Sequence, residues 1–186
     1  VNLDGRAATA DVPRITVGGL RMAAIDLEAT ADFMIEATDP DNRIGRPLFL
    51  TSANGEVLAR CSTEPQTERL FRAADLINAD GQPLVAASRL QSWFPLPERV
   101  ATTDLFHVVA RKAEAVGRTF YMFGASEAEN IVAVENVQKL YPDLKIIGRS
   151  HGYLRGEALR AKVEEINALA PDYLWVALGV PNEPAF

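Results

Sequence analysis

Disulfides, membrane spans and metal-binding clusters are all missing from this amino-acid sequence. Its 186 residues include a single cysteine, Cys61, so no intrachain disulfide can form, which is typical of a reducing compartment. Cys61 has no histidine near it in sequence, and we expect a buried, unreactive thiol. No apolar run approaches the roughly 18 residues of a membrane span, and no secretory signal peptide is present. No histidines, cysteines and carboxylates have the spacing of a metal site.

The sequence also has no excess of positive charge. It contains 25 acidic and 19 basic residues, for a net charge of -6 and a pI of about 5.0. Because nucleic-acid binding needs clustered lysine and arginine, we expect no nucleic-acid partner, and no tight adhesion of this segment alone to an anionic membrane. The 48% of apolar residues is enough for a sizeable core. We expect a flexible N-terminal leader over 1–13 and a single core over 14–186.

Two glycine-rich nucleotide motifs are absent as well. No G-x-G-x-x-G occurs, which disfavours a nicotinamide or flavin oxidoreductase, and no Walker loop is present. Gly124-Ala125-Ser126 leads into a helix N-terminus that suits a phosphate, but Glu127 and Glu129 would repel one, so a structural cap and a ligand contact both stay open. Asp39-Pro40-Asp41 has the D-x-D spacing of metal-dependent sugar transferases, but it follows a helix, and we interpret it as a solvated turn.

A regular alternation of strand-like and helix-like segments is present. Apolar runs predict strands over 15–17, 47–51, 76–79, 119–123, 145–147 and 173–178. Helical patterns predict helices over 27–37, 55–60, 67–74, 84–90, 103–116, from 126 onward and over 157–169. The alternation predicts an α/β fold, a Rossmann-like and mostly parallel sheet with helices on both faces. Right-handed crossovers bring the carboxyl ends of such strands to one edge, where we expect a ligand.

One acid stands out at this expected edge. Asp80 directly follows the apolar run 76–79 and precedes Gly81. A carboxylate at the carboxyl end of a parallel strand is placed to act on a ligand. Aspartate and glycine are also common in turns and helix caps, so a purely structural role for Asp80 stays open.

Two cationic or titratable side chains lie in loops near the same edge. Arg99 follows a proline-rich loop that would hold it in place, where its forked donors could clamp a diphosphate. A surface ion pair of Arg99 with Glu98 or Asp104 is the alternative. His151 could hydrogen-bond to a nucleotide or could have no role in binding.

Six short stretches occur in a characteristic order between about 15 and 181. They are Thr51-Ser52-Ala53-Asn54-Gly55-Glu56, Ala79-Asp80-Gly81, Glu98-Arg99-Val100-Ala101-Thr102-Thr103-Asp104-Leu105, Tyr141-Pro142-Asp143-Leu144-Lys145-Ile146-Ile147-Gly148, His151-Gly152-Tyr153 and Gly179-Val180-Pro181. Each is weak alone, but together and in this order the chain resembles the WecG/TagA/CpsF family of bacterial glycosyltransferases.

The resemblance implies a metal-independent, inverting transfer of a sugar from a UDP-sugar to a polyprenyl-diphosphate-linked saccharide, without a cofactor, in surface polysaccharide or teichoic acid synthesis. The sugar would be N-acetylmannosamine, its uronic acid, glucose or a similar one. Such a transfer needs a base for the attacking hydroxyl and positive charge for the leaving diphosphate. Asp80 matches the family's proposed base, Arg99 its arginine, and Asn54 its donor-contacting asparagine. Implied substrate contacts further include Thr51 or Ser52, Gly81, Gly124, His151, Gly152, Tyr153, Gly179, Pro181 and Glu183.

Two departures from the family pattern lie near the C-terminus. Glu183 stands where a glutamine is expected, and Pro184 removes a backbone donor. The family's chains continue into a basic segment, whereas this one stops at Phe186, so we expect a truncated core that binds UDP weakly and turns over poorly.

The resemblance places the protein in the bacterial cytoplasm, at the inner face of the membrane through that segment. Self-association through Trp93, Phe94 and Trp175 stays open, as does a catalytically silent UDP-binding or assembly module of the same fold.

Overall fold

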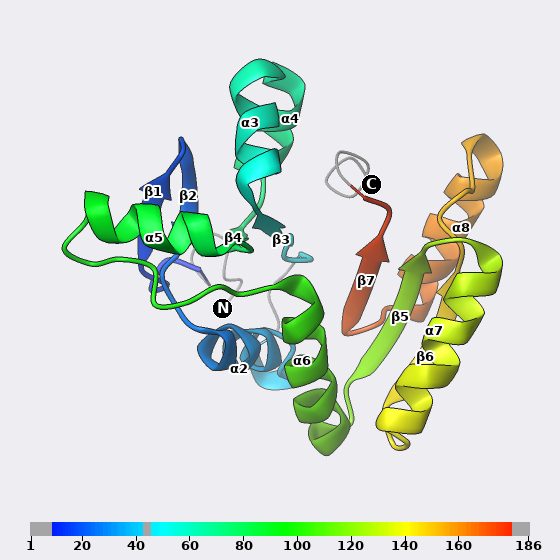
Figure 1. Ribbon diagram of the computed structural model, residues 1–186. Coiled ribbons are helices and arrows are strands. Elements are labelled where there is room, and N and C mark those ends of the chain that lie inside the picture. Colours follow the sequence, from blue (N-terminus) through cyan, green and yellow to red (C-terminus); the bar gives the residue numbers. More distant parts are fainter. Residues whose placement is uncertain (1–8, 43–45, 180–186) are drawn as a thin grey trace. The chain divides into compact units, whose positions relative to one another are not determined.

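The computed structural model describes residues 9–42 and 46–179 and confirms the α/β class (Figure 1). Helices connect strands that pair in parallel, as in Rossmann-like folds. The chain divides into two compact units, the first ending at Val109 and the second beginning at Ala110, within one helix. Each unit has its own sheets. The expected single core over 14–186 stays a prediction.

The first unit contains two strand pairs. β1 (Arg14–Val17) and β2 (Leu20–Ala23) form an antiparallel hairpin around Gly18-Gly19, and β2 had not been expected. β3 (Leu50–Ala53) pairs in parallel with β4 (Leu76–Ala79), and β2 lies beside β4. All four residues of β4 are buried, which is typical of a strand covered on both faces.

The start of β3 differs from the expectation. The apolar run predicted a strand from 47, but Pro47 has no N–H for a ladder, and pairing begins only at Leu50, which is in register with Leu76. Before β3, the Phe49 N–H donates to the Asp75 carboxylate (2.8 Å), and the Phe49 carbonyl accepts from the Asp75 N–H (2.8 Å). Asp75 therefore fixes the chain here in place of a strand ladder.

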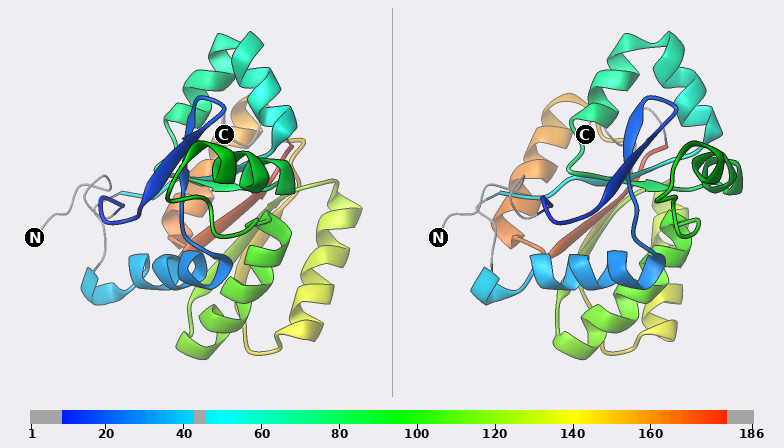
Figure 2. Two further views of the ribbon diagram at one scale, coloured as in Figure 1. Left: turned by 60° about the vertical axis from the view of Figure 1, so that its left-hand side comes forward. Right: turned by 90° about the vertical axis from the view of Figure 1, so that its left-hand side faces the viewer.

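Helices cover the strands of the first unit. They are α2 (Leu27–Ala37), the short 3-10 helix η1 (Pro40–Asn42), α3 (Gly55–Thr63), α4 (Pro65–Arg72), α5 (Gln82–Gln91) and α6 (Thr102–Val116), which continues into the second unit. α5 packs against β1 (Figures 1 and 2). Within the described residues, none of these helices has the length and apolar character needed to cross a bilayer.

Three local predictions for the first unit are confirmed. The Asp26 carboxylate accepts the Ala29 N–H (2.8 Å) and caps α2. The Asp39 carboxylate accepts the Asp41 N–H (2.9 Å), so the D-x-D stretch forms a local turn. Cys61 is buried, and burial raises the pKa of its thiol.

The second unit is a three-stranded parallel sheet in the order β6-β5-β7. Its strands are β5 (Thr119–Gly124), β6 (Lys145–Ser150) and β7 (Tyr173–Ala177). α7 (Glu127–Leu140) connects β5 to β6, and α8 (Gly156–Leu169) connects β6 to β7 (Figure 1). Because these two crossovers run in opposite directions, right-handed connections place the two helices on opposite faces. The direction reverses between β5 and β7, and ligands of such sheets bind outside the carboxyl ends of strands at that point.

Both faces of β5 are packed. Tyr121 and Phe123 contact Ile166 of α8, while Phe120, on the other face, makes ring contacts with Tyr173 (5.1 Å) and Trp175 (5.8 Å). Alternate residues of one strand thus pack in opposite directions, which explains why the sequence of β5 is apolar without interruption. The rigid sheet fixes the positions of the loops at its carboxyl edge.

Candidate active site

Polar side chains share one face where β3 and β4 end. Ser52 is in register with Asn78. Side chains alternate along a strand, so Asn54 and Asp80, two residues further along, lie on the same face as this pair. Thr51 lies on the opposite face. Of the two hydroxyls that the sequence left open, the structure therefore places Ser52 on the face of Asp80.

Asp80 directly follows β4, and its carboxylate is partly exposed to solvent. Its N–H donates to the Ala53 carbonyl (2.8 Å), so the ladder continues for one residue and fixes the backbone. The Asp80 side chain is 31% exposed, directly after the buried Ala79. Gly81 follows in extended backbone, and a Cβ there would make only ordinary contacts, the nearest at 3.6 Å from Leu84. The carboxylate can therefore meet a ligand without movement of the chain.

Arg99 lies between two carboxylates. One guanidinium nitrogen, Nη1, is 3.5 Å from Oδ1 of Asp80, and Nη2 donates to Oδ2 of Asp104 at 2.7 Å. The Asp104 contact was one of the alternatives that the sequence left open. Glu98, the other alternative, accepts the N–H of Leu27 at the start of α2 (2.7 Å). The contact with Asp80 is long, so it orients the two side chains more than it binds them together.

The loop that carries Arg99 is tied to the core on both sides. The Leu96 N–H donates to the buried hydroxyl of Ser88 on α5 (3.0 Å), and the Val100 N–H donates to the carbonyl of Ala79 (2.9 Å). Both Leu96 and Val100 are buried. The backbone of Arg99 is therefore held beside the end of β4, as the proline-rich sequence had suggested.

Ser52 and Asn54, on the same face, have structural partners of their own. The hydroxyls of Ser52 and Thr102 form a hydrogen bond at the start of α6. The side-chain oxygen of Asn54 accepts the Val57 N–H (3.0 Å) and caps α3. Asn78 is buried, and its side-chain oxygen has no hydrogen-bond partner within the described residues. Asn54 thus has an amide group left to offer a ligand, while its oxygen is used by the helix.

In the second unit, glycines bring the ends of the strands close together. Gly124 has a φ of +136°, and a Cβ there would lie 2.8 Å from the Cα of Ala177. A Cβ on Gly152 would collide with the Leu178 side chain and lie 3.2 Å from the Cα of Gly124. The Gly152 N–H donates to the Ala125 carbonyl (2.9 Å). Backbone packing therefore accounts for both glycines, and it also leaves main-chain atoms uncovered by side chains.

The N-terminus of α7 already holds a carboxylate. The Ser126 N–H donates to the Glu129 side chain (3.0 Å), and the Glu129 N–H donates to the Ser126 hydroxyl (3.3 Å), which confirms the predicted capping box. Hydrogen bonds from the Ser126 side chain and N–H lower the pKa of Glu129. An anion at this helix end would have to approach a charged carboxylate, so the structural alternative is the better supported one.

A buried asparagine that sequence reasoning missed joins the strand ends beneath these glycines. The Asn130 side-chain amide donates to the carbonyls of Gly124 (3.0 Å), Ser150 (3.2 Å) and Met122 (3.3 Å). These three bonds hold the exits of β5 and β6 together. The one available signal was a polar residue within the apolar stripe of α7.

The last predicted contacts lie after β6 and β7. The Nδ1 atom of His151 accepts the N–H of Tyr153 (3.1 Å), and the Tyr153 ring is 71% exposed. Gly179 has a φ of +73° and open space around it. Pro181 and Glu183 lie outside the described residues. His151 thus stabilises its own loop through this hydrogen bond. The exposed Tyr153 ring offers a ligand a larger surface than His151 does.

A protein-family model described as the glycosyl transferase WecG/TagA/CpsF family matches residues 15–186. The chain belongs to this family. The match confirms the resemblance inferred from the six sequence stretches.

Curated relatives are 28% to 32% identical to the chain over the aligned residues. A protein of Bacillus spizizenii strain W23 is 32% identical over 152 residues, covering 82% of this chain and 57% of the relative. Relatives from Bacillus subtilis strain 168 (28%) and Staphylococcus aureus strain MRSA252 (29%) cover 78% and 76% of the chain and 55% of their own lengths. All three are named N-acetylglucosaminyldiphosphoundecaprenol N-acetyl-beta-D-mannosaminyltransferase. The chain thus spans just over half the length of these curated relatives.

Most of the stretches that identify the WecG/TagA/CpsF family lie near the carboxyl ends of strands, whereas Tyr141-Pro142-Asp143-Leu144-Lys145-Ile146-Ile147-Gly148 leads into β6 from its amino end. In the first unit, Ser52, Asn54, Asp80 and Arg99 come together around the ends of β3 and β4. In the second unit, the glycine- and histidine-containing stretches follow β6 and β7. Asn78 of the first unit was missed because it lies inside an apolar strand, where a lone polar residue was the only signal.

Proposed function

We propose that the chain carries out an inverting, metal-independent transfer of a sugar from a UDP-sugar to a polyprenyl-diphosphate-linked saccharide in bacterial surface polymer synthesis. The names of its relatives specify a mannosaminyl group and an acceptor linked through a diphosphate to undecaprenol. They favour N-acetylmannosamine over its uronic acid or glucose as the donor sugar. The observation on which the proposal rests is the Asp80 carboxylate, exposed at the end of a buried strand and 3.5 Å from Arg99.

Asp80 would act as the general base. As the acceptor hydroxyl oxygen forms a bond to the anomeric carbon from one side, its proton passes to the Asp80 carboxylate, and the bond to UDP breaks on the other side. Within the described residues, Arg99 is the one side chain that donates to this carboxylate, and it does so at 3.5 Å. Lone pairs of Asp80 are therefore available to an acceptor hydroxyl.

Arg99 would stabilise the charge that develops on the leaving diphosphate. Its planar guanidinium has five N–H donors, a pattern that matches phosphate oxygens. The Asp104 carboxylate, which holds the guanidinium at 2.7 Å, is 51% exposed. An exposed ion pair contributes only about 0.2–1 kcal/mol, so a diphosphate could replace Asp104 at little cost. Arginine would thus supply charge that other transferases take from a metal ion.

The carboxyl edge of the second unit would offer its main chain to a ligand. Ligands of parallel sheets bind where the connections change direction, here between β5 and β7. Gly124 and Gly152 leave the backbone uncovered at that point, and the exposed Tyr153 ring lies in the following loop. The carboxylate at the start of α7 would disfavour a phosphate group at this edge.

We further propose peripheral association with the inner face of the cytoplasmic membrane, where a polyprenyl-linked acceptor would reside. Three large apolar side chains at the end of α5 support it: Leu90 is 91% exposed, Trp93 105% and Phe94 63%. Exposed aromatic rings of this kind insert at the interface between lipid and water. The residues from 81 to 97 include Arg89 but no acid, so nothing in this stretch repels anionic lipid.

Calorimetric titration tests the donor part of this proposal. UDP, UDP-glucose and UDP-N-acetylmannosamine are each added to the chain, first without metal and then with EDTA. We expect saturable binding that survives EDTA, tightest for UDP-N-acetylmannosamine. Binding that requires a divalent ion would contradict the metal-independent mechanism, and no binding of any of the three would contradict the proposed donor class.

A transfer assay separates an enzyme from a silent binding module of the same fold. The acceptor is a short-chain prenyl diphosphate carrying N-acetylglucosamine, and the products measured are UDP and the disaccharide lipid. An enzyme releases both in equal amounts, and the anomeric configuration of the new bond reports inversion or retention. Donor binding without any transfer would favour the silent module.

A further inference from the structure

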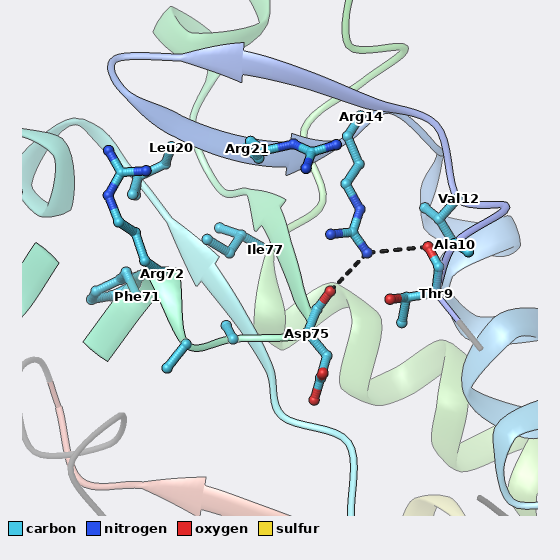
Figure 3. A pocket seen from close by; sticks show the side chains of 12 residues that line it. Thr9, Ala10, Val12, Arg14, Leu20, Arg21, Phe71, Arg72, Asp75 and Ile77 are labelled. Carbon is cyan, nitrogen blue, oxygen red and sulfur yellow. Dashed lines mark hydrogen bonds between the residues drawn. The ribbon is translucent and has the colours of Figure 1, made fainter. Parts of the chain in front are cut away.

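A cavity lies at the opposite end of β4 from Asp80 (Figure 3). Its volume is about 490 Å³, and it is bordered by β1, β2, the end of α4 and the start of β4. The lining residues are Thr9, Ala10, Val12, Arg14, Leu20, Arg21, Phe71, Arg72, Ala73, Ala74, Asp75 and Ile77. Asp75 precedes β4 and Asp80 follows it, which separates the two places by roughly 16 Å of extended chain. The cavity is therefore distinct from the face that carries Asp80.

Positive charge prevails in this cavity. Arg14, Arg21 and Arg72 line it, against a single carboxylate, that of Asp75. Asp75 is already neutralised from outside the cavity, because Arg46 donates to its carboxylate (2.9 Å). Because Arg72 is paired with Glu68 in the same way, the charge that prevails is that of Arg14 and Arg21, in a chain whose overall charge is -6.

Two of the guanidinium groups lie close together without an anion between them. Arg14 donates to the carbonyls of Thr9 (3.1 Å) and Asp75 (2.9 Å), which are neutral groups (Figure 3). Burial lowers the pKa of Arg14, and the positive charge of Arg21 lowers it further, while the Asp75 carboxylate acts in the opposite direction. An anion bound here would relieve both the desolvation and the repulsion.

The third arginine stands apart from this pair. Arg72 donates to the Glu68 carboxylate (2.8 Å) and to the Gly19 carbonyl (3.1 Å), so its charge is partly compensated. In Figure 3 it lies across the cavity from Arg14 and Arg21. The pair of Arg14 and Arg21 is therefore the stronger anion subsite.

Little apolar surface is open in this cavity. Leu20, Phe71 and Ile77 border it, but they are only 1%, 0% and 4% exposed. The open surface therefore belongs mainly to polar side chains such as Arg21 and Arg72, both of which are exposed. The volume of the cavity lies in the range of small-molecule sites.

We propose that this cavity binds a phosphorylated small molecule, with the phosphate at Arg14 and Arg21. Such a ligand bridges the β1–β2 hairpin and the start of β4. Because it binds only the folded protein, it stabilises this unit in proportion to its concentration. This site is separate from the proposed transferase function and does not depend on it.

UMP serves as the probe, with inorganic phosphate and uridine as its two halves. Binding is measured by calorimetry and by the shift in melting temperature of the whole chain. We expect UMP and inorganic phosphate to bind and uridine not to bind, because the arginines hold the phosphate group. Uridine binding as tightly as UMP would overturn the assignment of the phosphate to the arginines.

Four variants locate the bound UMP. Arg21 is exposed on β2, so Arg21→Ala should fold normally and weaken UMP binding by about 10-fold, and Arg21→Glu should abolish it. Arg89→Ala on α5 is the matched control outside the cavity, and Arg99→Ala reports binding at the Asp80 face. Both of these should keep the Arg21-dependent binding.

Three results would overturn the proposal. They are UMP binding that Arg21→Glu leaves unchanged, binding that is lost only in Arg99→Ala, and no binding of UMP at any accessible concentration. The second result would support nucleotide binding at the Asp80 face instead. Failure of this inference is thereby distinguished from failure of the proposed function.

Discussion

Replacing the Asp80 carboxylate by an amide tests the proposed chemistry most directly. Asp80→Asn keeps the size of the side chain and the backbone hydrogen bond to Ala53, but it removes the proton acceptor. General-base catalysis contributes a factor of about 10² to 10⁴, so kcat should fall by that factor, equivalent to about 3–5 kcal/mol of barrier. The KM for the UDP-sugar should change little, because the base contacts the acceptor.

The structure predicts that this loss does not come from unfolding. The Asp80 side chain is 31% exposed, and its contact with Arg99, itself 40% exposed, is 3.5 Å long. Removing an exposed ion pair of this kind costs at most about 1 kcal/mol, against a typical domain stability of about 5–15 kcal/mol. The variant should therefore stay folded, with an almost unchanged thermal unfolding curve.

Asp104→Asn is the matched control, since it removes the other carboxylate that contacts Arg99. That contact is the shorter of the two, at 2.7 Å, yet Asp104 has no proposed part in proton transfer. We expect less than about a 10-fold change, mainly in the KM for the UDP-sugar, because Arg99 loses orientation. Equal losses in both variants, or an Asp80→Asn variant that keeps a tenth of its activity, would refute the role of Asp80 as base.

Three further predictions concern stability and the membrane. Gly124→Ala should destabilise the chain by more than about 2 kcal/mol in urea unfolding, because the new Cβ would meet the backbone of Ala177; an unchanged midpoint would contradict the close approach. Trp93→Ser should lower sedimentation with anionic vesicles without changing UDP binding, and equal sedimentation would exclude the exposed ring as an anchor. Asp75→Asn should cost about 1–3 kcal/mol at pH 7, because hydrogen bonds to a buried carboxylate are lost. Although burial acts to raise the pKa of Asp75, hydrogen bonds from Arg46 and Phe49 outweigh it and lower that pKa, so the difference between wild type and variant should shrink below about pH 4 and vanish in acid.

The sequence predicted the elements of the fold well where each element has its own periodicity. Helix caps at Asp26 and Ser126 were recognisable because a cap and its partner lie within three residues of each other. β2 was missed because four residues are too few to show an alternation. The start of β3 was placed three residues early, since nothing local reveals that Asp75, 26 residues further on, holds Phe49.

The candidate site was predictable by residue type but not by arrangement. Asp80 and Arg99 were named from a strand end and a proline-rich loop, and the structure places them 3.5 Å apart. Strand register places Ser52 rather than Thr51 on the face of Asp80, and a single sequence does not reveal that register. Asn130 was missed because its three carbonyl partners come from strand ends that meet only in the folded sheet.

The two acids that flank β4 show why one is assigned to chemistry and the other to stability. Asp75 precedes the strand, is 8% exposed, and accepts hydrogen bonds from Arg46 and the Phe49 N–H. Asp80 follows the strand, is more exposed, and has one long contact with Arg99. A carboxylate that accepts three hydrogen bonds, two of them from a guanidinium, is stabilised in its charged form, whereas one with unused lone pairs can accept a proton from a substrate hydroxyl. Residue type and strand are the same for both acids and cannot distinguish them. The difference in hydrogen bonding is therefore the reason to place proton transfer at Asp80.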